Sequence, residues 1–347
     1  MTTLTDANPL ARDGATDAAL LRDLDRVRAA QRPWRSASVR ARLRVVDRLR
    51  YRLADHAEQF GGMLSALGRR SSAEAIVSEV LPLADACRYL RRVAPRLLAT
   101  RRPASWLRPV WLWGCDLRIA REPFGVVLVI GPSNYPLFLP AAQAIQALVA
   151  GNAVVVKPGA GGRAPLELLQ RLAGEAGLPD GLLTVTDESP RAAAALIDAG
   201  VDKVILTGSA HTGRAVSEQL AATTTPSAME LSGCDAAIVC DDAPLDRCAE
   251  AIAYGVRFNG GATCIAPRRV LADRATLDRL EPLLVERLAQ VAPVAAPQAV
   301  RRQGRALIHE AIDHGGRLVL GDPDAAEWSP IVLADVPRDS TLLATDL

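Results

Sequence analysis

Residues Phe124 to Pro136 read FGVVLVIGPSNYP and contain the clearest indication of the fold. Its five consecutive apolar residues, Val126–Ile130, are followed at once by glycine and proline. This pattern is typical of a short strand that is buried on both faces. The runs AVVVKP, LLTVT, DKVILTGS and AAIVC repeat it further along, each followed by a helical stretch. Strands that alternate with helices predict an α/β fold with a mostly parallel sheet covered on both faces.

The carboxyl ends of these strands are where such a sheet binds its ligands. The first strand leads into Asn134, and AVVVK ends at Lys157, directly before Pro158. In LTGSAHTG, Gly208 and Ser209 come at the expected start of a helix, where backbone N–H groups can approach a phosphate, and Gly213 lies one turn in. Taken alone, this glycine pattern is equally compatible with a plain tight turn. A glutamate placed like Glu230, in the apolar run AMEL, is more often an ordinary surface strand end than a general base.

The region before the first strand has a different texture. From about Asp17 to Thr100, Leu and Val recur at steps of three and four residues with Arg and Asp between them, which predicts amphipathic helices. Residues 105–122, SWLRPVWLWGCDLRIARE, alternate bulky side chains around Gly114 and predict a protruding β-hairpin. Because this segment carries Trp106, Trp111 and Trp113, we expect it to contact another subunit.

The composition excludes several classes of protein. The chain has 347 residues, 49% of them hydrophobic and 23% charged, and a formal net charge of +2, which gives no reason to expect nucleic acid or an anionic membrane as partner. It contains no apolar run of eighteen residues, so we expect a cytoplasmic protein without a membrane anchor. The six cysteines form no CxxC pair, which predicts reduced thiols and neither a metal site nor a disulfide framework.

One cysteine has an unusual setting. Cys264 lies in NGGATCIAP, Asn259–Pro267, a stretch without charged residues and with no histidine within forty positions. It is either a small buried residue or a nucleophile whose partners come from elsewhere in the chain.

Five motifs, in their order along the chain, resolve this choice: EPFGVVLVIGPSNYP, GNAVVVKP, LTGSAHTG, MELSG and NGGATC. Together they resemble the NAD(P)-dependent aldehyde dehydrogenase superfamily, and the similarity covers nearly the whole chain after about Ser36. The resemblance implies a Rossmann-like parallel sheet in a cofactor domain, with residues 1–104 as its N-terminal helical region and 123–232 as its NAD(P)-binding core. It also implies an oligomerisation hairpin at 105–122, an incomplete α/β catalytic domain at 233–347, and a homo-oligomer.

The resemblance also implies the residue roles. Cys264 corresponds to the nucleophile that attacks a small-molecule aldehyde, forming a thiohemiacetal and then a thioester. Asn134 and the Cys264 backbone N–H would stabilise the oxyanion, and Glu230 would be the general base for hydrolysis. The cofactor, NAD or NADP, would be held by residues matching the family's binding motifs: Lys157, Pro158, Gly208, Ser209, Gly213 and Asp346.

Two departures from the family pattern carry further expectations. Gly159 and Ala160 replace a Ser-Glu pair whose carboxylate binds the ribose hydroxyls and repels a 2′-phosphate, so we expect NADP to be at least tolerated, with Arg163 near enough to meet the phosphate. The sequence ends at Leu347, directly after Asp346, where the family pattern continues. We therefore expect this chain to be a weak or inactive dehydrogenase without the missing C-terminal part.

Two alternatives from other functional classes stay open at this point. A thiol hydrolase would pair a cysteine with a histidine, but none of the four histidines shows a recognisable pairing with Cys264 in the sequence. A catalytically inactive homologue would act through cofactor binding or subunit interaction alone.

Overall fold

The computed structural model describes residues 14–294, 296 and 298–345. Contacts divide the chain into two units, Met1–Leu231 (unit 1) and Ser232–Leu347 (unit 2). Each unit has a hydrophobic core of its own. The two units are therefore described separately.

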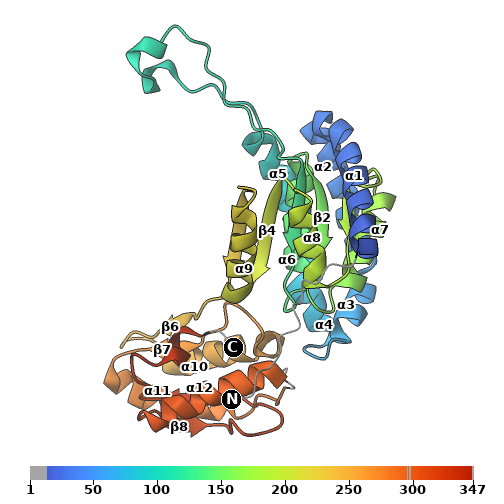
Figure 1. The fold of residues 1–347 in the computed structure, drawn as a ribbon. Helices are drawn as coiled ribbons and strands as arrows, with labels where there is room; N and C mark the ends of the chain where they lie inside the picture. The colour runs from blue at the N-terminus through green and yellow to red at the C-terminus, as the bar shows by residue number, and fades with distance from the viewer. Residues whose placement is uncertain (1–13, 295, 297, 346–347) are drawn as a thin grey trace. The chain divides into compact units, whose positions relative to one another are not determined.

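Unit 1 is built on a five-stranded parallel sheet with the order β3-β2-β1-β4-β5 (Figure 1). The strands are β1 (Val126–Ile130), β2 (Ala153–Lys157), β3 (Leu183–Val185), β4 (Lys203–Gly208) and β5 (Ser227–Leu231). Every residue of β1 is buried, as the uninterrupted apolar run predicts. The α/β fold with a parallel sheet is thus confirmed, and the sheet is Rossmann-like in its strand order.

The helices that connect the strands cover both faces of the sheet. They are α6 (Phe138–Val149), α7 (Arg163–Glu175), α8 (Pro190–Asp198) and α9 (Ala210–Ala221). Right-handed crossovers place α6 and α7 on one face, since the chain moves outward from β1 to β3, and place α8 and α9 on the other. The observed contacts agree, because α6 packs on β1 and β2 while α8 packs on β1 and against α9.

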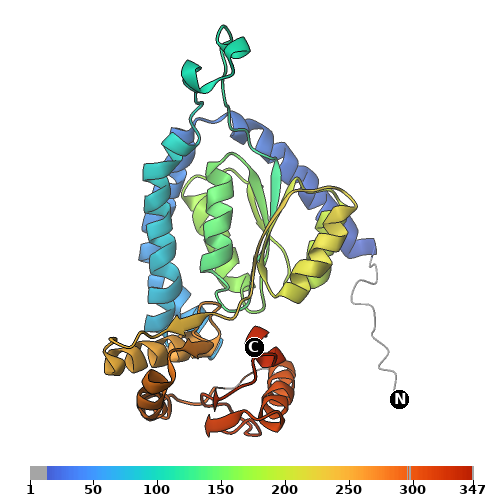
Figure 2. The ribbon, with the colours of Figure 1, turned by 90° about the vertical axis from the view of Figure 1, so that its left-hand side faces the viewer.

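The N-terminal region is helical, as the periodicity predicts. It consists of α1 (Gly14–Ser36), α2 (Val39–Asp55), α3 (Ala57–Ser65), α4 (Ser72–Ala75), a π-helical turn η1 (Ile76–Val80) and α5 (Leu81–Leu97). Helices α2 and α5 run side by side and both back α6 (Figure 2). Helix α1 packs on the opposite face of the sheet, against α8 and β2.

The segment 105–122 reaches away from the sheet after α5 (Figure 1), but it is not the regular β-hairpin that the alternation predicts. It contains two short 3₁₀ turns, η2 (Ser105–Leu107) and η3 (Val110–Leu112), and its arms meet in one antiparallel bridge, Arg101 with Ile119. Pro103 and Pro109 lack the N–H groups that a ladder needs, which explains the interrupted pairing. The three tryptophans are exposed, with exposed fractions of 58% or more.

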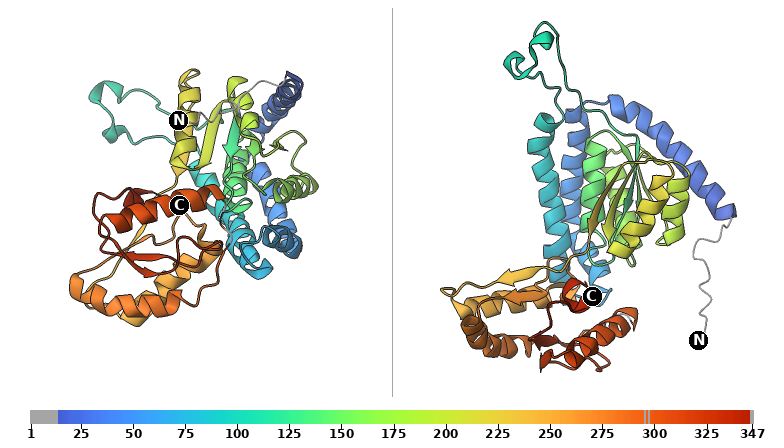
Figure 3. Two further views of the ribbon diagram at one scale, coloured as in Figure 1. Left: turned by 60° about the horizontal axis from the view of Figure 1, so that its bottom comes forward. Right: turned by 60° about the vertical axis from the view of Figure 1, so that its left-hand side comes forward.

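Unit 2 contains two small sheets and three helices in the part that the structure describes. The strands β6 (Ala236–Ile238) and β7 (Arg269–Leu271) pair in parallel, and β8 (Arg317–Leu320) and β9 (Val332–Ala334) pair antiparallel. The helices are α10 (Leu245–Arg257), α11 (Arg274–Leu288) and α12 (Gln298–Asp313). Helices α10 and α11 pack together and supply most of the buried residues of this core (Figure 3). Among the described helices, we find none with the length and apolar character needed to span a bilayer.

Candidate active site

The candidate site of unit 1 lies at the carboxyl ends of β1, β2 and β4. The strand order reverses between β1 and β4, because β2 and β3 are added on one side of β1 and β4 and β5 on the other. Loops diverge at such a switch point and leave a crevice for a ligand. Asn134 follows β1, Lys157 ends β2, and Gly208 ends β4, so the topology brings these predicted residues to one edge of the sheet.

Asn134 is half-buried in the loop between β1 and α6. Its side-chain oxygen accepts a hydrogen bond of 2.9 Å from the backbone N–H of Tyr135. This contact identifies the oxygen end of the amide, so Nδ2 is its donor end. An oxyanion needs such a fixed donor.

The loop that carries Asn134 is held by two arginines from the segment between α3 and α4. Arg69 donates to the carbonyl of Ser133 at 2.7 Å, and Arg70 donates to the carbonyl of Asn134 at 3.4 Å. The Arg70 guanidinium also lies over the ring of Tyr135, 5.4 Å from its centroid. The backbone on both sides of the Asn134 side chain is therefore fixed from outside the loop.

Glu79, on the π-helical turn η1, completes this support. It pairs with Arg70, and its Oε2 accepts the backbone N–H groups of Leu137 and Phe138 at 2.7 and 2.8 Å. Both N–H groups are at the start of α6, where a negative charge is favoured. Burial raises the pKa of the Glu79 carboxyl, against the opposing influence of Arg70 and the two N–H groups.

Lys157 is half-buried at the end of β2. Its backbone carbonyl accepts the N–H of Gly131 at 2.9 Å, which joins the ends of β2 and β1. Burial lowers the pKa of its ammonium, while the nearby carboxylates of Glu188 and Asp187 act in the opposite direction. A compact cation thus lies at the strand end, next to two acids that the sequence reasoning did not single out. Pro158, which follows it, is buried.

The turn after β4 has the geometry of a helix N-terminus that can receive an anion. Ser209 is the N-cap of α9, and its Oγ accepts the N–H of Thr212 at 3.2 Å. Other N–H groups of a first turn have no acceptor within the helix. A Cβ on Gly208 would meet only Leu206 Cδ1, at 3.6 Å, whereas a Cβ on Gly213 would lie 2.7 Å from Leu231 Cδ2. Gly213 therefore permits close packing of α9 on β5.

Glu230 lies on β5 and is exposed, with Thr207 of β4 as its partner in the parallel register. Thr207 in turn accepts a hydrogen bond of 2.9 Å from the Gln143 side chain of α6. The strand predicted to carry Glu230 is present, and its side chain is accessible to water.

Cys264 belongs to unit 2 and is exposed on a turn between α10 and β7. The turn is closed by a hydrogen bond of 3.1 Å from the N–H of Ala266 to the carbonyl of Thr263. Before it, Asn259 and Gly260 both have left-handed backbone angles, with φ of 54° and 59°, and the Asn259 side chain donates to the carbonyl of Ala262 at 3.1 Å. Cys264 is thus exposed and not a small buried residue, which is the setting that a reactive thiol needs.

The histidines of unit 2 are engaged with other groups. His309 lies 3.3 Å from Asp324, and His314 lies 2.7 Å from the carbonyl of Glu310. Neither contact involves Cys264. Within the described residues, no group of three or more His, Cys, Asp or Glu side chains could hold a metal ion. Asp346 lies outside the residues that the structure describes.

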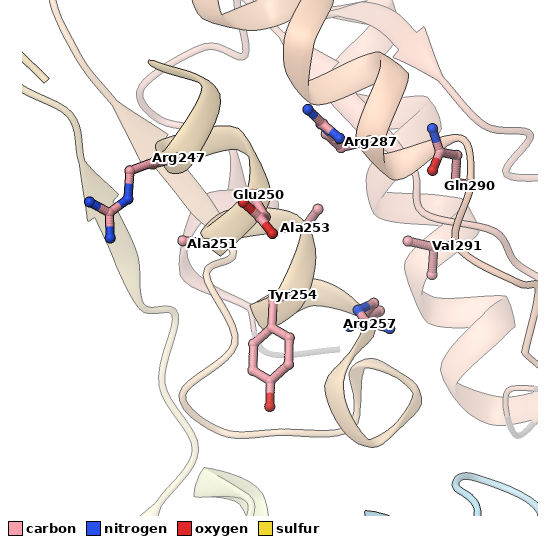
Figure 4. Close-up of a pocket in the computed structure, with 9 residues that line it drawn as sticks. All are labelled: Arg247, Glu250, Ala251, Ala253, Tyr254, Arg257, Arg287, Gln290 and Val291. Atoms are coloured by element: carbon pink, nitrogen blue, oxygen red, sulfur yellow. The ribbon is translucent and has the colours of Figure 1, made fainter. Parts of the chain in front are cut away.

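A pocket in unit 2 lies between α10 and the end of α11 and is lined in part by Tyr254, Arg257 and Arg287 (Figure 4). Cys264 is not among the described residues that line it. This pocket therefore belongs to a different place in unit 2 from the predicted nucleophile.

Comparison with known proteins identifies the family. The family model described as "Aldehyde dehydrogenase family" matches residues 10–347. The chain belongs to the aldehyde dehydrogenase family. It is 32% identical over 299 residues to the 4,4'-diapolycopene aldehyde oxidase of Methylomonas sp. and 34% identical over 256 residues to a putative succinate-semialdehyde dehydrogenase [NADP(+)] of Mycolicibacterium smegmatis. These matches cover 84% and 73% of this chain.

A solved aldehyde dehydrogenase of Mycobacterium tuberculosis, complexed with NAD+, has the same fold at a TM-score of 0.84 and 26% sequence identity, covering 94% of this chain and 70% of its own. The chain spans about half the length of the curated relatives it matches, 56% and 48% of the two named above.

The sequence analysis did not identify four charged residues that lie around the predicted site residues: Glu79, Arg69, Arg70 and Glu188. One signal could have found Glu79: it lies on the same helical face as Val80, Leu83 and Cys87, all of which are buried. A carboxylate on an apolar face needs a partner. The two arginines carried no such signal in a chain with 41 Lys and Arg residues.

Proposed function

We propose that this chain is an NAD(P)-dependent aldehyde dehydrogenase that oxidises an aldehyde to a carboxylic acid. The observation that carries the proposal is the gathering of Asn134, Lys157 and the Gly208–Ser209 turn at one edge of the sheet, in a chain that matches the family over residues 10–347. The exposed thiol of Cys264 in NGGATC supports it.

The chemistry requires a nucleophile because an aldehyde has no leaving group except hydride. The Cys264 thiolate would form a C–S bond with the carbonyl carbon, giving a thiohemiacetal. Nδ2 of Asn134 and the backbone N–H of Cys264 would stabilise the alkoxide oxygen of this adduct. NAD+ or NADP+, when bound, supplies the hydride acceptor. Glu230 would take a proton from the water that hydrolyses the Cys264 thioester, which breaks the C–S bond and frees the thiol.

The residues at the sheet edge fit a dinucleotide. The small residue Gly208 and the first turn of α9 suit a pyrophosphate, and the half-buried ammonium of Lys157 suits hydroxyl groups of a ribose. Relatives named for NADP and solved in complex with NAD+ support either dinucleotide. The exposed tryptophans of residues 105–122 support a homo-oligomer, with this segment as the contact.

The test is direct. The 347-residue chain is titrated with NADH and NADPH by fluorescence, and then assayed with aliphatic, aromatic and semialdehyde substrates for NAD(P)H formation. Binding of a dinucleotide together with aldehyde oxidation supports the proposal. Ester hydrolysis without dinucleotide binding would establish the thiol hydrolase instead. Dinucleotide binding without oxidation, with every aldehyde and with Cys264 verified as a free thiol, would establish the inactive homologue.

A further inference from the structure

The loop after β2 brings no acidic side chain to the sheet edge at its first two positions after Pro158. A Cβ on Gly159 would overlap the carbonyl of Pro132 and lie 2.6 Å from the Ser133 nitrogen. Ala160, the next residue, is exposed and has no polar group. Judged from these two positions alone, nothing in the site would repel a phosphorylated ribose.

A carboxylate reaches the same place from the next strand. β3 pairs with β2 in parallel, with Val185 opposite Val156, and the N–H of Thr186 donates to the Val156 carbonyl at 2.9 Å. The residues after Thr186 are therefore beside the end of β2, where Lys157 lies. The charge of Glu188 acts on the Lys157 ammonium, as does the charge of Asp187, the other acid of this loop.

Glu188 is held in place by a helix N-terminus. Its Oε1 accepts the backbone N–H of Arg163 at 3.0 Å, at the first residue of α7, where Gly162 provides no side-chain cap. A fixed negative charge thus takes a donor that an incoming phosphate would otherwise use. Nε of the Arg163 side chain donates to Glu167 at 2.7 Å, so part of its charge is already paired within α7.

We propose that Glu188 is a specificity-determining residue of the cofactor site, which accepts the hydroxyl groups of an unphosphorylated ribose beside Lys157 and repels a 2′-phosphate. In dinucleotide-binding sheets an acidic residue near the end of the second strand binds the ribose hydroxyl of NAD, whereas an arginine accommodates the phosphate of NADP. Glu188 comes to that strand end from the loop after β3. The chain therefore prefers NAD. This assignment rests on the proposed function, and it opposes the tolerance of NADP that residues 159 and 160 alone predict.

The experiment compares the dissociation constants of NADH and NADPH, measured by fluorescence titration of the full 347-residue chain. The wild type is expected to bind NADPH at least about tenfold more weakly than NADH. Glu188→Gln keeps the shape and removes the charge, and it is expected to bring the two constants within about threefold of each other. Thermal unfolding of the variant establishes that it is folded.

Glu175→Gln is the matched control, because it removes one carboxylate from the far end of α7, the helix whose first N–H group binds Glu188. Glu175 ends the 13-residue α7, so it is roughly 18 Å from Arg163, beyond the screening length of about 8 Å at physiological salt. The ratio of the NADPH to the NADH dissociation constant should be the same for Glu175→Gln as for the wild type. Equal binding of NADH and NADPH by the wild type, or the same shift in both variants, overturns the role of Glu188 alone. Failure of both dinucleotides to bind overturns the proposed function and this role together.

Discussion

Glu79 and Arg70 form an ion pair in which both side chains are almost completely buried, 0% and 3% exposed. Glu79 also binds the first N–H groups of α6, and Arg70 binds the carbonyl of Asn134. A single buried pair thus connects the N-terminal helical region to the loop that carries the predicted oxyanion donor. Removing either partner would leave an unpaired buried charge.

Replacement of Glu79 by Gln is expected to lower the free energy of unfolding by about 3–5 kcal/mol, because the Arg70 charge then remains buried without its counter-ion. Urea denaturation at neutral pH measures the change. Glu58→Gln, at an exposed position in the first turn of α3, is the control and should cost less than about 1 kcal/mol. A similar small loss in both variants would show that the buried pair contributes little.

Replacement of Cys264 by Ala should lower aldehyde oxidation at least about a thousandfold, since the covalent centre is lost. Binding of NADH should stay within about twofold of the wild type, because the thiol is not an anchor for the dinucleotide. Cys240→Ala, which removes another exposed thiol of unit 2, is the matched control. Oxidation at a comparable rate by the Cys264→Ala protein would refute its role as nucleophile.

Replacement of Glu230 by Gln should stall hydrolysis of the thioester while leaving its formation intact. Rapid mixing with aldehyde and NAD+ should then give a burst of NADH, close to one equivalent per active site, followed by slow turnover. Glu218→Gln, on the exposed surface of α9, should keep the steady rate of the wild type. A variant that loses the burst together with the steady rate would place Glu230 before the thioester and not after it.

Replacement of Gly159 by Ser, the residue type common in the family, should destabilise unit 1 by about 1–3 kcal/mol, because the new side chain meets the backbone of Pro132 and Ser133. Gly174→Ala is the opposite case: it lies inside α7 with no atom within 4 Å of the added carbon, and should stabilise by about 0.5–1 kcal/mol. Denaturation midpoints compare the stability of the two variants with that of the wild type. A Gly159→Ser protein as stable as the wild type would show that the loop can relax.

Burial raises the pKa of the Cys87 thiol from 9.0 to about 12. The unfolded chain therefore releases this proton first, so the contribution to stability is present below about pH 9 and is lost as the pH rises toward 12. The loss amounts to at most about 4 kcal/mol. Denaturation measured between pH 8 and about 11 gives the free energy of unfolding at each pH. This free energy should fall less steeply with pH for Cys87→Ala than for the wild type. Parallel curves for the two proteins would contradict the raised pKa of Cys87.

Local sequence patterns were enough to predict most of the helices, the strands and the motifs. The buried run Val126–Ile130 and the cap at Ser189 before α8 depend on neighbours within a few residues, so local patterns predict them. The placement of Asn134 and Lys157 at strand ends follows from the same patterns, and the family resemblance supplied their roles.

The contacts of these residues with side chains far away in the sequence could be seen only in the folded chain. Glu79 meets the start of α6 across 58 positions, and Glu188 reaches the start of α7 across 25. Such contacts depend on strand order and helix packing, which no local periodicity encodes. The interrupted hairpin at 105–122 has the same cause: alternation describes side chains, whereas pairing depends on backbone N–H groups that its prolines do not have.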